Sequence, residues 1–226
     1  MDIIILAAGK GTRLKPLTDT TPKPLIPIAG RGALLRTLDL LPAQVTRVIL
    51  VVGYLQDKIR ETVGAEWNGR PVVYVETPIL DGTGGALRAA RDMITSERFF
   101  VVNGDDLYST ADLEQLLTHE RGLLAAKRTL TSASDVWDAQ DGLIRDIRRA
   151  ESGEEAWINI GAYLLGHEWF ETEPILSPGK TDEWSLPHPI PQLIEQIPYH
   201  LVEASFWQPG GTFEEIAEAE KKLAET

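Results

Sequence analysis

Several residue types and patterns are missing from this sequence, and each absence excludes a class of protein. There is no cysteine, so the chain can form no disulfide, no zinc–thiolate centre and no thiol nucleophile. The four histidines show no metal-ligand spacing, and we assign them no catalytic role. Met1 is followed by a short apolar strand, without a basic leader or a long apolar run. We therefore expect neither a signal peptide nor a membrane span, and a cytoplasmic protein.

Positive charge is scarce overall but concentrated in one place. The chain has 22 Lys and Arg against 34 Asp and Glu, a formal net charge of −12. A nucleic-acid-binding protein needs a broad basic face, so we expect no nucleic-acid partner. Residues 1–36 nevertheless carry a local charge of +4, from two acids (Asp2, Asp19) and six bases (Lys10, Arg13, Lys15, Lys23, Arg31, Arg36). This cluster indicates a local site for an anion.

The hydrophobic pattern of the first 120 residues alternates between strand-like and helix-like segments. Buried strands are expected at 3–7, 47–53, 71–76 and 98–106, and helices at 32–41, 54–64, 83–94 and 110–120. Such alternation predicts an α/β fold in which helices cover both faces of a mostly parallel sheet. The second half is less regular, with strands expected at 122–127, 143–148, 157–165 and 200–205 and an acidic amphipathic helix at 213–225.

Three polar features follow predicted strands of the first half. They are the glycine loop at 8–12, the loop at 81–85 and the acidic pair at 105–106. Ligands of such sheets bind beyond the carboxyl ends of the strands. We therefore expect the three features to converge at one edge of the sheet.

The glycine loop has the sequence G-K-G-T-R, from Gly9 to Arg13. Glycines let the backbone approach a phosphate closely, and arginine can clamp a phosphate with two parallel hydrogen bonds. The loop is not a P-loop, and Leu14 replaces the third glycine of a dinucleotide-binding fingerprint. Taken alone, a G-x-G after a strand is a tight turn at least as often as a phosphate site.

A longer pattern favours the phosphate site. The motif L-A-A-G-x-G-T-R-L-x-P-L-T followed by P-K-P occupies residues 6–24. It resembles the signature of the sugar-1-phosphate nucleotidylyltransferases, also called NDP-sugar pyrophosphorylases. Four further stretches fit the same family, at 80–90, 101–106, 158–165 and 206–221. The resemblance therefore extends over the whole chain.

The resemblance implies a fold and a domain organisation. The fold is a Rossmann-like, three-layer nucleotidyltransferase α/β fold with a mixed, mostly parallel central sheet. We expect a single domain over 1–226, with a nucleotide-binding half at about 1–120 and a sugar-binding lobe at about 121–226. We expect no acetyltransferase arm of the kind that some relatives carry, and either a monomer or a homodimer.

The resemblance also implies a reaction and its residues. An NTP and a sugar 1-phosphate would react, with Mg²⁺ as cofactor, to give an NDP-sugar and pyrophosphate. Arg13, Lys23 and Asp105 would be catalytic, and Asp105 would also bind the metal. The nucleotide would contact Leu6, Ala7, Ala8, Gly9, Gly11, Thr12, Glu76 or Thr77, Gly82, Thr83, Gly84 and Gly85. The sugar phosphate would contact Arg149, Asn159 and Gly161.

Each of the polar assignments has a structural alternative. Lys23 would otherwise be a solvated loop lysine, although Pro22 and Pro24 stiffen its backbone. Asp105 would otherwise form a turn, and Asn159 would contact a neighbouring strand.

The chain departs from the family pattern at two positions. Pro209 stands where many relatives have a second metal-binding aspartate, and Arg149 stands where relatives often have a phosphate-binding lysine. Two alternative functions therefore remain open. One is a cytidylyltransferase that acts on a non-sugar phosphate such as phosphocholine. The other is a nucleotide- or sugar-nucleotide-binding regulator with weak or lost catalysis.

Overall fold

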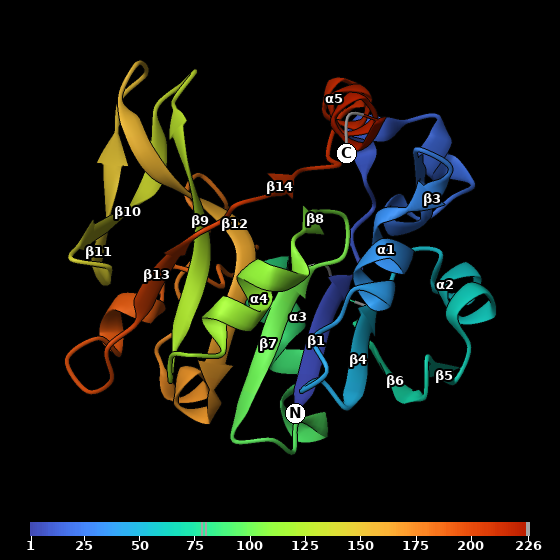
Figure 1. Ribbon diagram of the computed structural model, residues 1–226, viewed down its shortest axis with the longest axis horizontal. Helices are drawn as coiled ribbons and strands as arrows, with labels where there is room; N and C mark the ends of the chain where they lie inside the picture. Colours follow the sequence, from blue (N-terminus) through green and yellow to red (C-terminus); the bar gives the residue numbers. More distant parts are fainter. Residues whose placement is uncertain (78, 80, 225–226) are drawn as a thin grey trace.

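One large sheet runs through most of the computed structural model, which describes residues 1–77, 79 and 81–224 (Figure 1). In spatial order its strands are β10 (Ser134–Gln140), β11 (Leu143–Ala150), β13 (His200–Glu203), β9 (Gly122–Thr129), β12 (Glu155–Gly166), β7 (Arg98–Asn103), β1 (Asp2–Ala7), β4 (Arg47–Val52), β6 (Arg70–Glu76) and β5 (Glu66–Trp67). Strands from both halves of the chain share this sheet, because β12 pairs with β7. The two halves of the chain are therefore joined through one continuous sheet.

The sheet is mixed, as predicted, but its parallel part is smaller than predicted. Strands β7, β1, β4 and β6 are parallel to one another, and β13 is parallel to β9. The remaining pairs, including β12 with β7 and with β9, are antiparallel. The physical reason is connection length, since short links favour antiparallel pairs and parallel pairs need long crossovers. For example, Asp141 and Gly142 alone join β10 to β11, and both have positive φ angles.

Five α-helices lie in the described part of the chain. They are α1 (Ala33–Asp39), α2 (Gln56–Val63), α3 (Gly82–Ala89), α4 (Thr110–Leu116) and α5 (Phe213–Ala224). Short 3₁₀ helices lie at η1 (Thr12–Leu14), η2 (Leu17–Asp19), η3 (Lys23–Leu25), η4 (Arg91–Met93), η5 (His167–Glu171) and η6 (Ile190–Gln192). The helix predicted at 83–94 is thus divided between α3 and η4. Residue 225 of the helix predicted at 213–225 lies outside the described residues.

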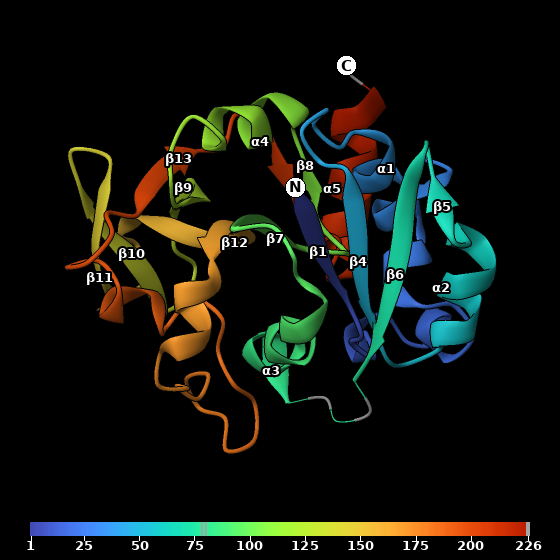
Figure 2. The ribbon, with the colours of Figure 1, turned by 90° about the horizontal axis from the view of Figure 1, so that it is seen from below.

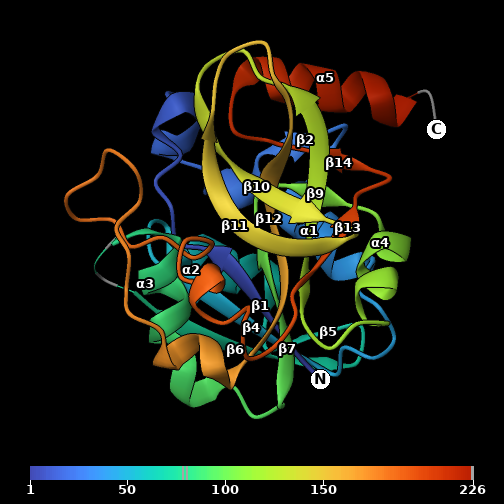
Figure 3. The ribbon, with the colours of Figure 1, turned by 90° about the vertical axis from the view of Figure 1, so that its left-hand side faces the viewer.

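The alternation of side chains along β1 explains the three layers. Ile3 and Ile5 face a core shared with α1, α2 and α4, whereas Ile4 and Leu6 face a core shared with α3 and η5. All four side chains are buried. Because successive residues of a strand point to opposite faces, a run of apolar residues requires cover on both sides. Figure 3 shows α3 and α4 on opposite sides of the sheet.

The last helix, α5, packs back onto the first part of the chain. Two small two-stranded sheets lie beside it, β2 (Pro27–Ile28) with β3 (Arg31–Gly32), and β8 (Leu107–Tyr108) with β14 (Trp207–Gln208). Ala219 of α5 is buried against Ile28 and Leu107, and the Glu220 carboxylate accepts a hydrogen bond from the amide of Ala29 at 3.0 Å. Strand β14 pairs with β8, the short strand that follows β7, and the chain then continues into α5.

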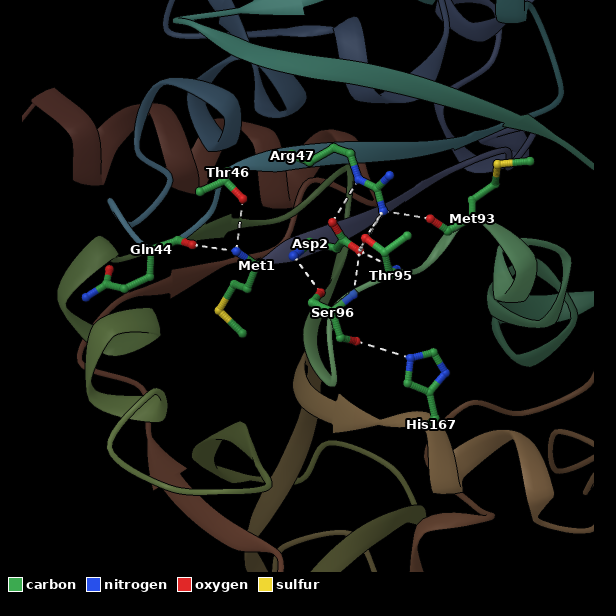
Figure 4. A network of polar contacts seen from close by, with 9 residues as sticks. All are labelled: Met1, Asp2, Gln44, Thr46, Arg47, Met93, Thr95, Ser96 and His167. Carbon is green, nitrogen blue, oxygen red and sulfur yellow. Dashed lines mark hydrogen bonds and ion pairs between the residues drawn. The ribbon is translucent and has the colours of Figure 1, made fainter.

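The amino end of β1 is fixed by a network of polar contacts (Figure 4). The buried carboxylate of Asp2 accepts two hydrogen bonds from Arg47, at 2.8 and 2.7 Å, and bonds from the amides of Thr95 and Ser96 at 2.8 and 3.2 Å. This network joins β1, β4 and the segment before β7 at the edge of the sheet opposite the glycine loop.

None of the helices in the described residues is long and apolar enough to cross a membrane.

Candidate active site

A cavity of about 570 Å³ lies at the carboxyl ends of the parallel strands. Its walls are formed by Leu6, Ala8, Gly9, Lys10, Gly11, Thr12, Thr77, Ile79, Gly82, Thr83, Ala86, Asn103, Asp105, Ser177 and Glu183. The structure thus brings together the three polar features that the sequence predicts to converge. Ala7, also assigned to the nucleotide, is buried in the core at the end of β1 and is not part of this wall.

The glycine loop has a backbone conformation that its second glycine makes possible. Gly11 has a φ angle of +62°. Residues with a Cβ atom rarely adopt this conformation, whereas glycine adopts it readily. A Cβ atom at Gly11 would also lie 2.8 Å from Cβ of Lys23 and 2.9 Å from Cγ2 of Thr18. The Thr18 hydroxyl donates a hydrogen bond to the carbonyl of Gly11 at 3.0 Å. The loop is therefore held close to the segment that carries Lys23.

Lys23 and Asp105 form an ion pair at the edge of the cavity. The Lys23 amine donates to the Asp105 carboxylate, and the two side chains are only 15% and 24% exposed. Lys23 is therefore neither fully solvated nor far from the predicted metal ligand.

Three other basic residues of the N-terminal cluster, Arg13, Lys10 and Lys15, have different surroundings. Arg13 is exposed and lies beside Gly211, where a Cβ atom would be 3.1 Å from Nη2 of Arg13 and 3.5 Å from Nζ of Lys23. Lys10 lines the cavity itself. Lys15 is paired with Asp19 at 3.1 Å on the surface. Lys10 thus belongs to the cavity wall, and Arg13 and Lys23 both lie beside Gly211.

Asp106, next to Asp105, is a buried part of the framework. Its carboxylate accepts bonds from Asn103 at 3.3 Å and from Tyr108 and Trp207 at 3.4 Å. Burial raises the pKa of Asp106 to about 7, and the negative charge of Asp105 adds to the effect. These contacts fix the loop that presents Asp105.

The residues predicted to read the base are divided by the structure. Gly82 and Thr83 line the cavity, whereas Gly84 and Gly85 are buried in α3 behind it. Thr77 also lines the cavity, and its hydroxyl donates to the carbonyl of Ile79 at 2.7 Å. The Glu76 carboxylate turns away to Arg60, at 2.8 Å. Of the two alternatives, Thr77 is therefore the one that faces the cavity.

Two of the three predicted sugar-phosphate residues line a separate cavity of about 250 Å³ in the lobe. Arg149 and Asn159 both contribute to its walls. Arg149 is paired with Asp135 at 3.0 Å, and the same carboxylate lies 3.1 Å from Nε2 of His188. Gly161 contacts a wall residue of each cavity, since a Cβ atom there would be 2.0 Å from Nδ2 of Asn103 and its amide donates to Oδ1 of Asn159 at 3.4 Å.

Several wall residues are absent from the sequence-based assignments. Asn103 lies in the stretch V-V-N-G-D-D, so its position before Asp105 was a usable signal. Ser177 and Glu183 come from a loop of the lobe, and Ser177 is 72 positions beyond Asp105, the nearest other wall residue in the sequence. No motif in the sequence marks them, because only the tertiary fold brings this loop to the cavity.

The donor set around Asp105 fits magnesium. Mg²⁺ binds oxygen ligands and is usually held by one or two carboxylates together with substrate phosphates and water. Across the described residues no three or more His, Asp or Glu side chains are grouped to hold a metal ion. Of the two carboxylates in the cavity wall, Asp105 and Glu183, Asp105 is the one beside Lys23, so Asp105 could hold a metal ion that arrives with a nucleotide.

Sequence comparisons match this chain to known proteins along almost all of its length. A family model described as nucleotidyl transferase matches residues 2–144. The chain is 32% identical over 226 residues to the bifunctional protein GlmU of Methanocaldococcus jannaschii, an alignment that covers 99% of this chain and 54% of that protein. It is 30% identical over 233 residues to mannose-1-phosphate guanylyltransferase of Mycobacterium tuberculosis, covering 99% and 64%.

A solved structure shows the same fold. HddC from Yersinia pseudotuberculosis, complexed with GMP-PN, superimposes with a TM-score of 0.71 at 26% identity, covering 98% of this chain and 99% of that one. The chain spans about half the length of the first curated relatives it matches.

Proposed function

The chain belongs to the nucleotidyl transferase family, and from this premise we propose that it transfers a nucleotidyl group from an NTP to a sugar 1-phosphate. The products are an NDP-sugar and pyrophosphate. The observation that carries the proposal is the single cavity in which the glycine loop, Lys10, Asp105 and the start of α3 face one another. That arrangement offers backbone and cationic groups for a triphosphate, and an apolar wall for a base.

The reaction is an in-line displacement at the α-phosphorus. A phosphate oxygen of the acceptor forms a bond to the α-phosphorus, and the bond from that phosphorus to the bridging oxygen breaks. Pyrophosphate leaves with the electron pair. The attacking oxygen is already anionic at neutral pH, so the protein need not remove a proton. The main obstacle is repulsion between two polyanions, which positioned positive charge relieves.

The cations of this chain can supply that charge. Lys10, at the glycine loop, faces the β- and γ-phosphates. Lys23 leaves the Asp105 carboxylate and neutralises charge near the α-phosphate, while Arg13 holds the departing pyrophosphate. Magnesium bound by Asp105 would supply further neutralisation and would align the phosphate oxygens.

The acceptor would bind toward the lobe. Arg149, Asn159 and His188 line the second cavity, and they offer hydrogen-bond donors and acceptors that suit sugar hydroxyls. Gly161 and Asn103, in contact between the two cavities, mark the boundary between nucleotide and acceptor.

The test is pyrophosphate release from GTP, CTP, UTP, ATP and dTTP, each with a set of sugar 1-phosphates and with phosphocholine. Each reaction is run with Mg²⁺ and again with excess EDTA. The proposal expects release that requires a sugar 1-phosphate and stops with EDTA. Release only with phosphocholine would indicate the cytidylyltransferase alternative. Nucleotide binding without release under any condition would indicate the regulator.

A further inference from the structure

A hairpin from the lobe contributes to the wall of the larger cavity. Leu176 and Trp184 form a β-bridge, and the amide of Ser177 donates to the carbonyl of Glu183 at 2.7 Å. The amide of Lys180 donates to the carbonyl of Ser177 at 2.9 Å. This hairpin, residues 176–184, belongs to the orange loop at the bottom of Figure 2, close to α3. Its residues Ser177 and Glu183 are part of the cavity wall.

The hairpin is fixed to the beginning of α3. The amide of Trp184 donates to the carbonyl of Asp81 at 2.5 Å, and the amide of Gly84 donates to the carbonyl of Trp184 at 2.9 Å. A Cβ atom at Gly82 would lie only 2.4 Å from the Trp184 carbonyl oxygen. Because glycine is the only residue that permits this approach, the two backbones are in direct contact. The position of Glu183 relative to α3 is therefore set by main-chain contacts.

Glu183 lies beside the beginning of α3 in the cavity wall. Its carbonyl carbon would be 3.0 Å from a Cβ atom at Gly82, and Gly82, Thr83 and Ala86 of α3 line the same cavity. Lys10, Gly11 and Asp105 come from other segments of the wall. If the phosphates contact those segments, as the proposed function requires, the base contacts the beginning of α3, beside Glu183.

Among the residues that the structure describes, the Glu183 side chain has one partner, Lys180. The Lys180 amine contacts its Oε1 atom at 2.9 Å, and the Glu183 side chain is 39% exposed. An ionised carboxylate accepts hydrogen bonds and cannot donate them. It therefore favours a base edge that carries N–H donors and disfavours an edge with carbonyl oxygens.

We propose that Glu183 selects nucleotides whose base has an exocyclic amino group, guanine above all. Guanine presents N1–H and N2–H₂ as two adjacent donors that match the two oxygens of a carboxylate, and cytosine presents one amino group. Uracil and thymine present a single N3–H between two carbonyl oxygens, which the carboxylate repels. This inference rests on the proposed function and specifies its nucleotide.

The test is calorimetric binding of GTP, CTP and UTP with Mg²⁺ and without acceptor, to the wild type and to Glu183→Gln. We expect the wild type to bind GTP at least about tenfold more tightly than UTP, because a hydrogen bond to a charged group contributes that much. Glu183→Gln reduces this ratio severalfold, since an amide can donate to a carbonyl of uracil. The matched control is Asp182→Asn, which alters the neighbouring exposed carboxylate outside the cavity wall and leaves the ratio unchanged.

Other outcomes separate the two proposals. A wild type that binds UTP as tightly as GTP, or a ratio that Glu183→Gln leaves unchanged, overturns the inference about Glu183 alone. A change in the KM of the acceptor without a change in the GTP to UTP ratio also overturns it, because Glu183 would then contact the acceptor. If GTP, CTP and UTP fail to bind, ATP and dTTP are titrated in the same way, and failure of all five nucleotides overturns the proposed function as well.

Discussion

The Lys23 amine is bonded to the Asp105 carboxylate across the edge of the nucleotide cavity, between residues that are 82 positions apart in the chain. The pair joins the segment after the glycine loop to the end of β7. Each group has a different partner in the proposed reaction. Lys23 neutralises charge near the α-phosphate, and Asp105 would bind magnesium. The ion pair holds these two side chains in place, and in the proposed reaction each neutralises the other until substrate replaces that contact.

A double-mutant cycle on this pair gives the first prediction. Lys23→Met or Asp105→Asn alone leaves a partly buried charge without its partner, and we expect each to lower the free energy of unfolding by about 1–3 kcal/mol. The double variant should lose less than the sum of the two. Each single variant should also lower turnover by about 10²-fold or more, because a charge that stabilises the transition state is removed. Urea unfolding and pyrophosphate release measure the two effects.

The surface pair Lys15 and Asp19 provides the control for this cycle. Its side chains are 59% and 50% exposed, so Lys15→Met should change stability by no more than about 0.5 kcal/mol. Strictly additive losses at Lys23 and Asp105 would contradict the coupling that we infer from the structure.

The second prediction concerns the beginning of α5. Thr212 and Glu215 form a variant of a capping box. The Thr212 hydroxyl accepts a hydrogen bond from the Glu215 amide at 3.2 Å. The Glu215 carboxylate accepts a hydrogen bond from the Gly211 amide at 2.7 Å. A Cβ atom at Gly211 would lie 2.8 Å from Oε2 of Glu215 and 3.1 Å from Nη2 of Arg13. We expect Gly211→Ala to displace Arg13 and to lower kcat about 10- to 100-fold.

Variants of Glu215 distinguish the hydrogen bond from the charge. Glu215→Gln keeps an acceptor for the Gly211 amide and should retain kcat within about threefold, whereas Glu215→Ala should resemble Gly211→Ala. Glu214→Ala, on the exposed neighbour, is the control. If Gly211→Ala remained folded and kept the wild-type kcat in steady-state kinetics, the prediction that Gly211 keeps Arg13 in place for the reaction would be refuted.

The sequence allowed the nucleotide side of the site to be predicted better than the acceptor side. Gly11 and Asp105 follow apolar strands directly, so the topology of a parallel sheet places them together. Glu183, in a loop, and Asp135, in β10, follow no such rule, because the packing of the lobe brings them to the cavities. Strand β10 was missed for a related reason, since its sequence S-D-V-W-D-A-Q contains two charged residues that obscure the apolar alternation. Local pattern was thus sufficient where neighbouring strands position the site, and insufficient where distant segments do.

The third prediction is a pH dependence of stability that originates at Asp2. Burial by itself raises the pKa of this carboxyl, but hydrogen bonds from Arg47 and from the amides of Thr95 and Ser96 outweigh burial and lower the pKa from 3.8 to about 2 (Figure 4). A carboxyl with a lower pKa in the folded state binds its proton more weakly there than in the unfolded chain. Its contribution to stability is therefore complete above pH 3.8 and declines as the pH falls through about 2.

The size of the effect follows from the shift in pKa. The difference between the folded and unfolded values corresponds to about 2 kcal/mol at neutral pH. Asp2→Asn should therefore be less stable than the wild type at pH 7 by at least about 2 kcal/mol, since the Arg47 guanidinium also loses its partner. The difference in the free energy of unfolding between the wild type and Asp2→Asn should narrow as the pH is lowered from 4 toward 2. Urea unfolding at several pH values measures it, with Asp92→Asn on an exposed carboxyl as the control. A gap that stays constant over this range would show that protonation of Asp2 does not contribute to acid unfolding.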